Sequence, residues 1–139
     1  MQVKVYDYLS EDAKFIRETV FMKEQGFENE FDDVDNAASH IVMYDDRNRP
    51  VATCRVFESS EKHEFILGRL AVMGDFRGMQ IGTKMVQEAE NIVLKKGGTS
   101  LVLHAQCRVE AFYEQSGYAA FGAVDDDEGC PHIWMRKRL

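Results

Sequence analysis

The segment Arg77-Gly78-Met79-Gln80-Ile81-Gly82 brings together residue types that suit a phosphate group. It combines a cationic side chain with two glycines, and it stands between an apolar, strand-like run and a helix-patterned run. The first N–H groups of a helix have no partner within the helix and carry a partial positive charge. Glycine lacks the Cβ atom that would hold a phosphate away from those groups. The segment therefore predicts a pyrophosphate site, although short glycine-containing turns also occur without a ligand.

Titratable side chains elsewhere in the chain could move protons. His40 and His104 are candidates because histidine titrates near neutral pH, and each could equally be a structural histidine held by a hydrogen bond. Four acidic residues could bind a cation or accept a proton through water: Glu24, Glu30, Asp32 and Asp35. Such a cluster is more often a solvated face. Arg69, inside a strand pattern, offers a third interpretation, because a buried arginine pairs with a carboxylate and would tether the acidic segment to the sheet.

Length and composition limit the class of protein. A chain of 139 residues, 45% of them hydrophobic, predicts one globular domain spanning 1–139. Acidic residues (24) outnumber Lys and Arg (17), and the net charge of −7 argues against nucleic-acid binding, which needs a basic face. No apolar run reaches the roughly 20 residues that span a bilayer, and no signal-peptide pattern is present. Three cysteines without a C-x-x-C pair indicate neither a disulfide framework nor a metal site, so we expect a cytoplasmic protein.

Hydrophobic periodicity predicts the elements that position these residues. Strands are expected at 3–8, 40–44, 51–58, 64–73, 100–104, 118–123 and 130–136. Helices are expected at 11–22, 83–96 and 109–115, with a polar loop over 23–38 and an acidic turn over 125–129. The short apolar run 100–104 suits a buried strand parallel to 64–73, reached by a right-handed crossover through the helix 83–96. The order of elements predicts an α+β domain.

This order, with a basic turn after the fourth strand, resembles the GCN5-related N-acetyltransferase (GNAT) fold over nearly the whole chain. Arg77 and Gly82 match the first and last positions of the family's Arg/Gln-x-x-Gly-x-Gly/Ala pattern, whereas Gln80 replaces its middle glycine. The segment from Phe112 to Tyr118 resembles the family's F-Y-x-x-x-G-F/Y motif. The resemblance implies a mixed, mostly antiparallel sheet of about six to seven strands, splayed between strands 4 and 5 and flanked by helices.

A narrower resemblance is to the small bacterial ElaA/YjcF-like acetyltransferases. It is carried by Arg17-Glu18-Thr19-Val20-Phe21, Glu24-Gln25, Glu30-x-Asp32-x-x-Asp35, His40, Val51-Ala52-Thr53-Cys54-Arg55, Gly68-Arg69, Leu103-His104-Ala105-Gln106 and His132. The N-terminal part also resembles acyl-homoserine-lactone synthases, which share the fold and are longer than this chain. Both resemblances imply an acyl-CoA-dependent enzyme.

The family resemblance implies acetyl-CoA as the co-substrate. Its expected contacts are Leu70, Ala71, Val72, Arg77, Gly78, Met79, Gln80, Ile81, Gly82, Thr83 and Tyr113. The pantetheine arm would run beside 70–72 as an added strand, and backbone N–H near Val72 would polarise the thioester carbonyl. Tyr113 is expected to be the general acid toward the CoA sulfur, because a phenol is protonated at neutral pH. The competing interpretation of Tyr113 is an aromatic residue of the core.

The acceptor implied by the resemblance is an amine of a small molecule or peptide. Its proton would pass to His104, to His40 or to water, and the expected acceptor contacts are Glu24, Glu30, Asp32, Asp35, Gln106 and His132. Cys107, beside His104 and Arg108 in the sequence, suggests a covalent acetyl-cysteine route, but direct attack in a ternary complex is the stronger default.

Three questions stay open at the level of sequence. An acyl-homoserine-lactone-type synthase and a non-catalytic CoA-binding sensor are alternative functions on the same fold. The identity of the amine acceptor is not encoded in any motif. The chain could be a monomer or a homodimer, in which the C-terminal strand ending at Leu139 would pair with a neighbour.

Overall fold

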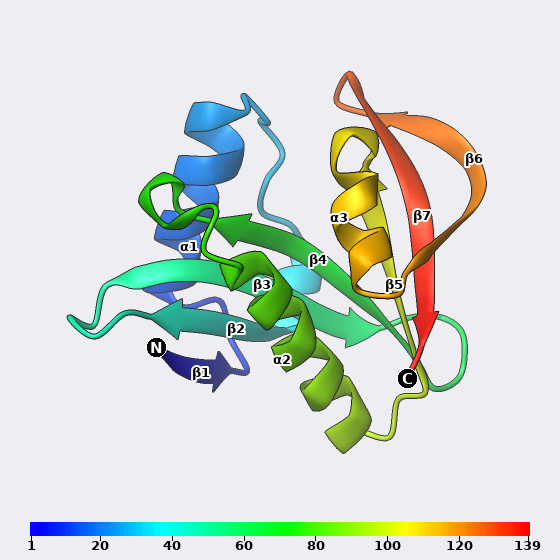
Figure 1. Ribbon diagram of the computed structural model, residues 1–139, viewed down its shortest axis with the longest axis horizontal. Coiled ribbons are helices and arrows are strands. Elements are labelled where there is room, and N and C mark those ends of the chain that lie inside the picture. Colours follow the sequence, from blue (N-terminus) through cyan, green and yellow to red (C-terminus); the bar gives the residue numbers. More distant parts are fainter.

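A single seven-stranded sheet organises the chain, and the computed structural model describes all residues 1–139 (Figure 1). The strand order is β1-β2-β3-β4-β5-β7-β6, and every neighbouring pair is antiparallel except β4 and β5, which are parallel. This confirms the predicted α+β fold with its mixed, mostly antiparallel sheet. The strands are β1 (Gln2–Tyr6), β2 (Ser39–Tyr44), β3 (Pro50–Glu58), β4 (Glu64–Val72), β5 (Ser100–Gln106), β6 (Ala119–Asp127) and β7 (Cys130–Arg138).

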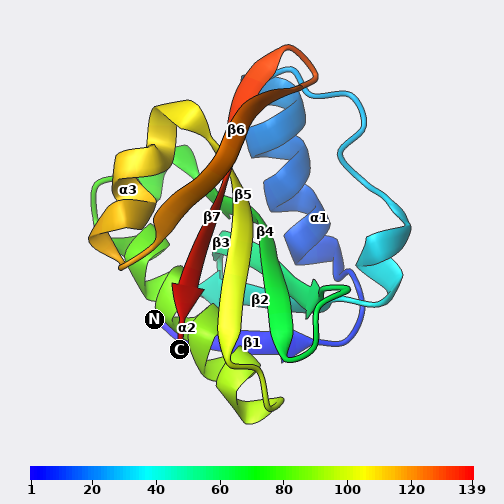
Figure 2. The ribbon, with the colours of Figure 1, turned by 90° about the vertical axis from the view of Figure 1, so that its right-hand side faces the viewer.

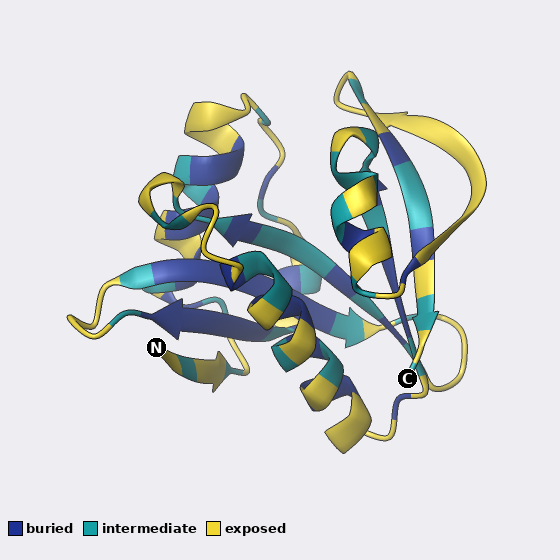
Figure 3. Cartoon of the chain, viewed as in Figure 1, coloured by how far each residue is buried: buried dark blue, intermediate teal, exposed yellow.

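Helices cover both faces of the sheet because alternate strand residues point to opposite sides. On β2, Val42 and Tyr44 pack with α1 (Glu11–Arg17), whereas Ile41 and Met43 belong to the larger core on the side of α2 (Ile81–Lys95). Residues of α2 at helical spacing are buried in that core, and the remaining face of the helix is exposed (Figure 3). The short helix α3 (Glu110–Gln115) contributes Tyr113 to the same core, so α2 and α3 share one face of the sheet.

The sheet opens between β4 and β5. These strands pair only where Glu64–Leu67 meets Ser100–Leu103, and beyond that point β4 stays with β3 while β5 stays with β7. Figure 1 shows the two strands starting together near the C-terminus and then diverging. A β-bulge contributes, since β4 has one residue more than β3 between their paired positions and Arg69 adopts a left-handed φ of 54°. The predicted splay between strands 4 and 5 is confirmed.

Several boundaries differ from the sequence prediction. The first helix continues beyond α1 as a π-helical segment, Glu18–Glu24, and α2 begins at Ile81 rather than at 83. Strand β6 runs through most of the acidic stretch that was expected to be a turn. The turn is confined to Glu128 and Gly129, whose φ values of 50° and 78° are both positive, as in the two-residue hairpin turns that match strand twist.

The C-terminal strand is not at an edge of the sheet. Strand β7 lies between β5 and β6, and its backbone is paired on both sides, so the predicted homodimer contact through this strand is wrong (Figure 2). The edges are β1 and β6. No helix of the chain has the length and apolar character that crossing a membrane requires.

Candidate active site

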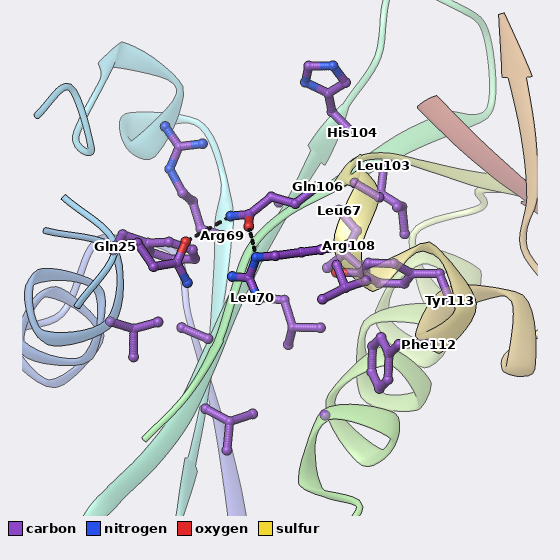
Figure 4. Close-up of a pocket in the computed structure, with 18 of the residues that line it drawn as sticks. Gln25, Leu67, Arg69, Leu70, Leu103, His104, Gln106, Arg108, Phe112 and Tyr113 are labelled. Atoms are coloured by element: carbon purple, nitrogen blue, oxygen red, sulfur yellow. Dashed lines mark hydrogen bonds between the residues drawn. The ribbon is translucent and has the colours of Figure 1, made fainter. Parts of the chain in front are cut away.

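A cavity of about 880 Å³ occupies the gap between β4 and β5. Its walls come from the diverging parts of these strands, the first turn of α2, α3, the π-helical segment and the residues that follow it, and the β6–β7 turn. Figure 4 shows Phe112 and Tyr113 on one side of the cavity and Gln25 and Arg69 on the other. The cavity therefore joins segments that are far apart in the sequence, and most of the predicted site residues line it.

The turn before α2 presents unpaired N–H groups to the cavity. No side chain caps the helix, and the N–H groups of Ile81, Gly82 and Thr83 have no acceptor within the protein. Gln80, the departure from the family pattern, has φ 60° and ψ 22°, a left-handed conformation that glycine adopts without strain and other residues at a cost of about 1–2 kcal/mol. Met79 is exposed and does not line the cavity, so its predicted contact is not supported.

Gly82 also has a packing role that was not expected from the sequence. A Cβ atom at this position would lie 3.0 Å from Cζ of Phe112, which is closer than ordinary van der Waals contact. The absence of a side chain therefore lets the ring of Phe112 pack over the first turn of α2. In this way Gly82 allows α2 to pack against α3, where Tyr113 directly follows Phe112 in the sequence.

The edge of β4 that faces the cavity has backbone groups near Val72 that pair with no neighbouring strand. The N–H of Met73 donates to the carbonyl of Val51 on β3 (2.8 Å). Because the two groups of a trans peptide point in opposite directions, the carbonyl of Val72 points to the open side. Leu70, Ala71 and Val72 all line the cavity. Arg77 donates from Nε to this Val72 carbonyl (3.0 Å) and from Nη2 to Glu24 Oε2 (2.7 Å).

Tyr113 is a buried cavity residue with an unpartnered hydroxyl. Its side chain is 9% exposed, and its ring lies edge-on to Phe112 and Tyr118. Burial raises the pKa of Tyr113, so the hydroxyl keeps its proton at neutral pH. The hydroxyl of Tyr118 is different, since it donates to Glu90 (2.9 Å). Tyr113 thus belongs to the core through its ring and is free to donate through its hydroxyl.

Polar side chains of β5 and β7 form the opposite half of the cavity. Leu103 and Ala105 face the large core, so strand alternation places His104 and Gln106 on the other face, beside His132 of β7. His104 donates from Nε2 to Asp125 Oδ1 (2.7 Å), and its ring centroid lies 4.7 Å from that of His132. His132 itself is held through Nδ1 by the carbonyl of Cys130 (2.7 Å).

Gln106 links two walls of the cavity. It donates from Nε2 to Gln25 Oε1 (2.9 Å) and accepts from Arg108 Nε (2.8 Å), as the dashed lines in Figure 4 show. A second link is made by Glu128 at the β6–β7 turn, whose Oε1 accepts from the backbone N–H of Glu28 and of Asn29 (3.2 and 3.3 Å). The residues after the π-helical segment are therefore attached to both β5 and the β6–β7 turn.

The predicted acceptor residues Glu30, Asp32 and Asp35 lie instead in an ion-pair network. Arg17, 1% exposed, donates to Glu30 Oε2 (2.8 Å) and to Asp35 Oδ1 (2.7 Å), and Arg55 contacts Asp32 and Asp35 (2.7 and 2.8 Å). Arg69 completes the network at 3.0 Å from Glu30 Oε2. Asp32 and Asp35 do not line the cavity, while Glu30 does with its carboxylate already paired. The tether predicted for Arg69 is thus present, and it takes the place of acceptor binding.

The network also shifts the pKa values of its carboxyl groups. Burial raises the pKa of Asp35, but the hydrogen bonds and charges of Arg17 and Arg55 outweigh it and lower the pKa to about 2. The hydrogen bonds from Arg55 lower the pKa of Asp32. Burial dominates at Glu30 and raises its pKa against the opposing charges of Arg69 and Arg17. Asp32 and Asp35 therefore stay ionised at neutral pH, where their partners hold the loop against the sheet.

Two predicted reactive residues lie outside the cavity. His40 is 1% exposed, does not line the cavity, and donates from Nε2 to the backbone carbonyl of Asp35 (2.9 Å). Burial lowers the pKa of His40, so it is a neutral structural residue rather than a base in contact with a ligand. Cys107 is also absent from the cavity lining, which removes the geometry that a covalent route through its thiol would need.

Some cavity residues were not predicted from the sequence. Phe21 and Phe27 pack edge-on to each other with ring centroids 6.5 Å apart, and both line the wall next to Glu30. Asp127 and Glu128 reach the cavity because β6 pairs with β7 up to the turn. The β6 side of this pairing contains extra residues between Phe121 and Asp125, and no sequence pattern indicated that irregularity.

Comparison with known proteins agrees with this arrangement. A family model for the acetyltransferase (GNAT) domain matches residues 5–139. The curated relative YjcF of Bacillus subtilis (strain 168), an uncharacterised N-acetyltransferase, is 32% identical over 131 residues, covering 91% of this chain and 90% of YjcF. The solved structure of ElaA from Escherichia coli shares the fold with a TM-score of 0.83 at 23% identity, covering 98% of this chain and 99% of ElaA. An acyl-CoA N-acyltransferase from Pseudomonas aeruginosa gives a TM-score of 0.85 at 21% identity, covering 98% of each chain.

The chain belongs to the GNAT acetyltransferase family, and it is an N-acetyltransferase. The subgroup resemblance to ElaA and YjcF is confirmed by the same comparisons. Three features of the structure agree with this family. Strands β4 and β5 diverge, the first turn of α2 has no capping side chain, and a cavity lies in the gap between the two strands.

Proposed function

We propose that the protein transfers the acetyl group of acetyl-CoA to an amine of a small molecule or peptide, by direct attack in a ternary complex. The observation that carries this proposal is that a single cavity is lined by all the groups that the transfer needs. Its lining includes the unpaired N–H groups of the first turn of α2, Tyr113 with its unpartnered hydroxyl, and the polar residues His104, Gln106 and His132.

The cofactor end suits a pyrophosphate followed by an extended arm. The N–H groups of Ile81, Gly82 and Thr83 would donate to phosphate oxygens, with Arg77 as the cation. The open edge of β4 would take the pantetheine amides as an added strand. Because the N–H and C=O of one strand residue point to the same side, the N–H of Val72 also faces the open edge, where it would polarise the thioester carbonyl.

Tyr113 and the β5 face would handle the protons of the transfer. As the amine nitrogen bonds to the carbonyl carbon and the C–S bond breaks, the sulfur leaves with the electron pair of that bond. Tyr113 would donate its proton to this sulfur, since burial keeps the hydroxyl protonated. His104, directly or through water, would accept the proton that the amine releases. Cys107 takes no part, because it does not line the cavity.

A CoA-release assay over classes of amines, run beside calorimetry with CoA alone, tests this function. We expect CoA to bind, and thiol to be released from acetyl-CoA only when a suitable amine is present. Failure of CoA to bind would overturn the cofactor assignment. Binding without thiol release over polyamines, aminoglycosides, amino acids and peptides would overturn the proposed reaction and favour a CoA-binding sensor.

A further inference from the structure

We propose that Glu24 sets the affinity of the cofactor site, because its carboxylate holds Arg77 in a position that a bound pyrophosphate would have to change. This inference rests on the proposed function. The sequence suggested Glu24 as a contact for the acceptor amine, whereas the structure pairs it with the cation of the cofactor end. Glu24 would then act as an internal competitor of the phosphate rather than as an acceptor ligand.

Arg77 has a carboxylate partner within the protein. Its Nη2 lies 2.7 Å from Glu24 Oε2, and both side chains are partly exposed (48% and 37%), so solvent and solutes can reach the pair. Two nitrogens of the Arg77 guanidinium, Nε and Nη2, already donate within the protein, so fewer of its donors are available to a phosphate oxygen. Phosphate and carboxylate compete for the same planar donors of arginine. When a phosphate binds Arg77, Arg77 therefore exchanges the carboxylate of Glu24 for the phosphate.

The second contact of Arg77 involves the open edge of β4. Its Nε donates to the carbonyl of Val72 (3.0 Å), and that carbonyl points away from β3 into the gap. An arm that pairs with β4 as an added strand needs this acceptor. Arg77 thus holds a backbone group of the pantetheine path with one part of its guanidinium and Glu24 with another. Loss of the Glu24 contact would free Nη2 for a phosphate oxygen and leave the side chain of Arg77 with the Val72 contact alone.

The segment that contains Glu24 also forms the acceptor wall. Polar contacts to three residues attach the segment 24–29 to the rest of the cavity: Glu24 contacts Arg77, Gln25 contacts Gln106, and the backbone N–H groups of Glu28 and Asn29 contact Glu128. Release of the first link would leave the other two in place. Gly26, with φ 79° and open space where a Cβ atom would lie, separates Glu24 and Gln25 from Asn29. Replacement of Glu24 by a phosphate at Arg77 can therefore move the side chain of Glu24 while the acceptor wall stays attached.

The test is calorimetric titration of CoA into the wild type and Glu24→Gln. Because an exposed ion pair contributes little, we expect the dissociation constant to fall about two- to fivefold in this variant. Glu28→Gln is the matched control, since it removes the same charge from the same segment, and Glu28 uses only its backbone N–H in the contact with Glu128. Its dissociation constant should stay within about 1.5-fold of the wild type.

A second pair of variants isolates Arg77 as the partner. Introducing Glu24→Gln into an Arg77→Gln background should leave CoA affinity unchanged, because the competing contact is already absent. Equal gains from Glu24→Gln and Glu28→Gln would overturn the proposal, as would a gain that persists without Arg77, or a loss of affinity in Glu24→Gln. Absence of CoA binding in the wild type would instead overturn the proposed function itself.

Discussion

Replacing Arg17 with methionine should destabilise the protein by about 3–5 kcal/mol, the cost of breaking a buried ion pair by removing one partner. Arg17 donates four hydrogen bonds, three to the carboxylates of Glu30 and Asp35 and one to the backbone carbonyl of Glu30. Both acidic residues are 4% exposed, so water cannot replace these donors. Asp35 would keep Arg55, whereas Glu30 would depend on Arg69 alone.

Urea unfolding followed by circular dichroism measures this loss as a change in the free energy of unfolding. The expected penalty is a large part of the roughly 5–15 kcal/mol that a domain usually has, so the variant should fold and unfold at clearly lower urea. Arg69→Met is the control, because its side chain is 26% exposed and Glu30 would remain paired with Arg17. We expect it to cost about 1 kcal/mol. A loss below about 1 kcal/mol for Arg17→Met, or one no larger than that of Arg69→Met, would contradict the reasoning.

The remaining predictions concern proton transfer and pH. Tyr113→Phe should lower kcat by about 100-fold or more with little change in CoA affinity, and an unchanged kcat would remove the hydroxyl from the mechanism. Cys107→Ala should retain full turnover, and a dead variant with a normal fold would revive the covalent route. Burial raises the pKa of Asp35, but Arg17 and Arg55 lower it overall to about 2. The ionised carboxylate therefore stabilises the folded protein fully above about pH 4, and this stabilisation is lost as the pH falls towards 2. The difference in unfolding free energy between the wild type and Asp35→Asn should therefore shrink over that range, and a constant difference would refute the assignment.

Sequence reasoning predicted the parts of the site that depend on local pattern. The basic turn, the amphipathic helix after it and the parallel pair of strands all follow from residue types and their spacing. The position of Tyr113 followed from a motif rather than from periodicity. These features were accessible because each is determined by residues that are close together in the chain.

The features that were missed depend on long-range pairing. Nothing local indicates that Arg17 would bury its charge against Glu30 and Asp35, so the acidic segment was assigned to the acceptor. The backbone angle of Gln80 could not be inferred from its residue type, because left-handed glutamine is uncommon. The pairing of Asp125 with His104 requires the irregular register of β6, which arises from contacts with β7.

The π-helical segment Glu18–Glu24 bears on how this chain can vary during evolution. A π-turn contains one residue more than an α-turn, and such turns occur frequently at functional sites. Winding the same residues as an α-helix, with about 3.6 residues per turn instead of the wider π-turn, would change the angle around the helix axis at which the following residues leave the segment. Glu24 and Gln25 would then leave the positions from which they reach Arg77 and Gln106. Relatives should therefore preserve the wider turns of this segment more strictly than the types of its residues.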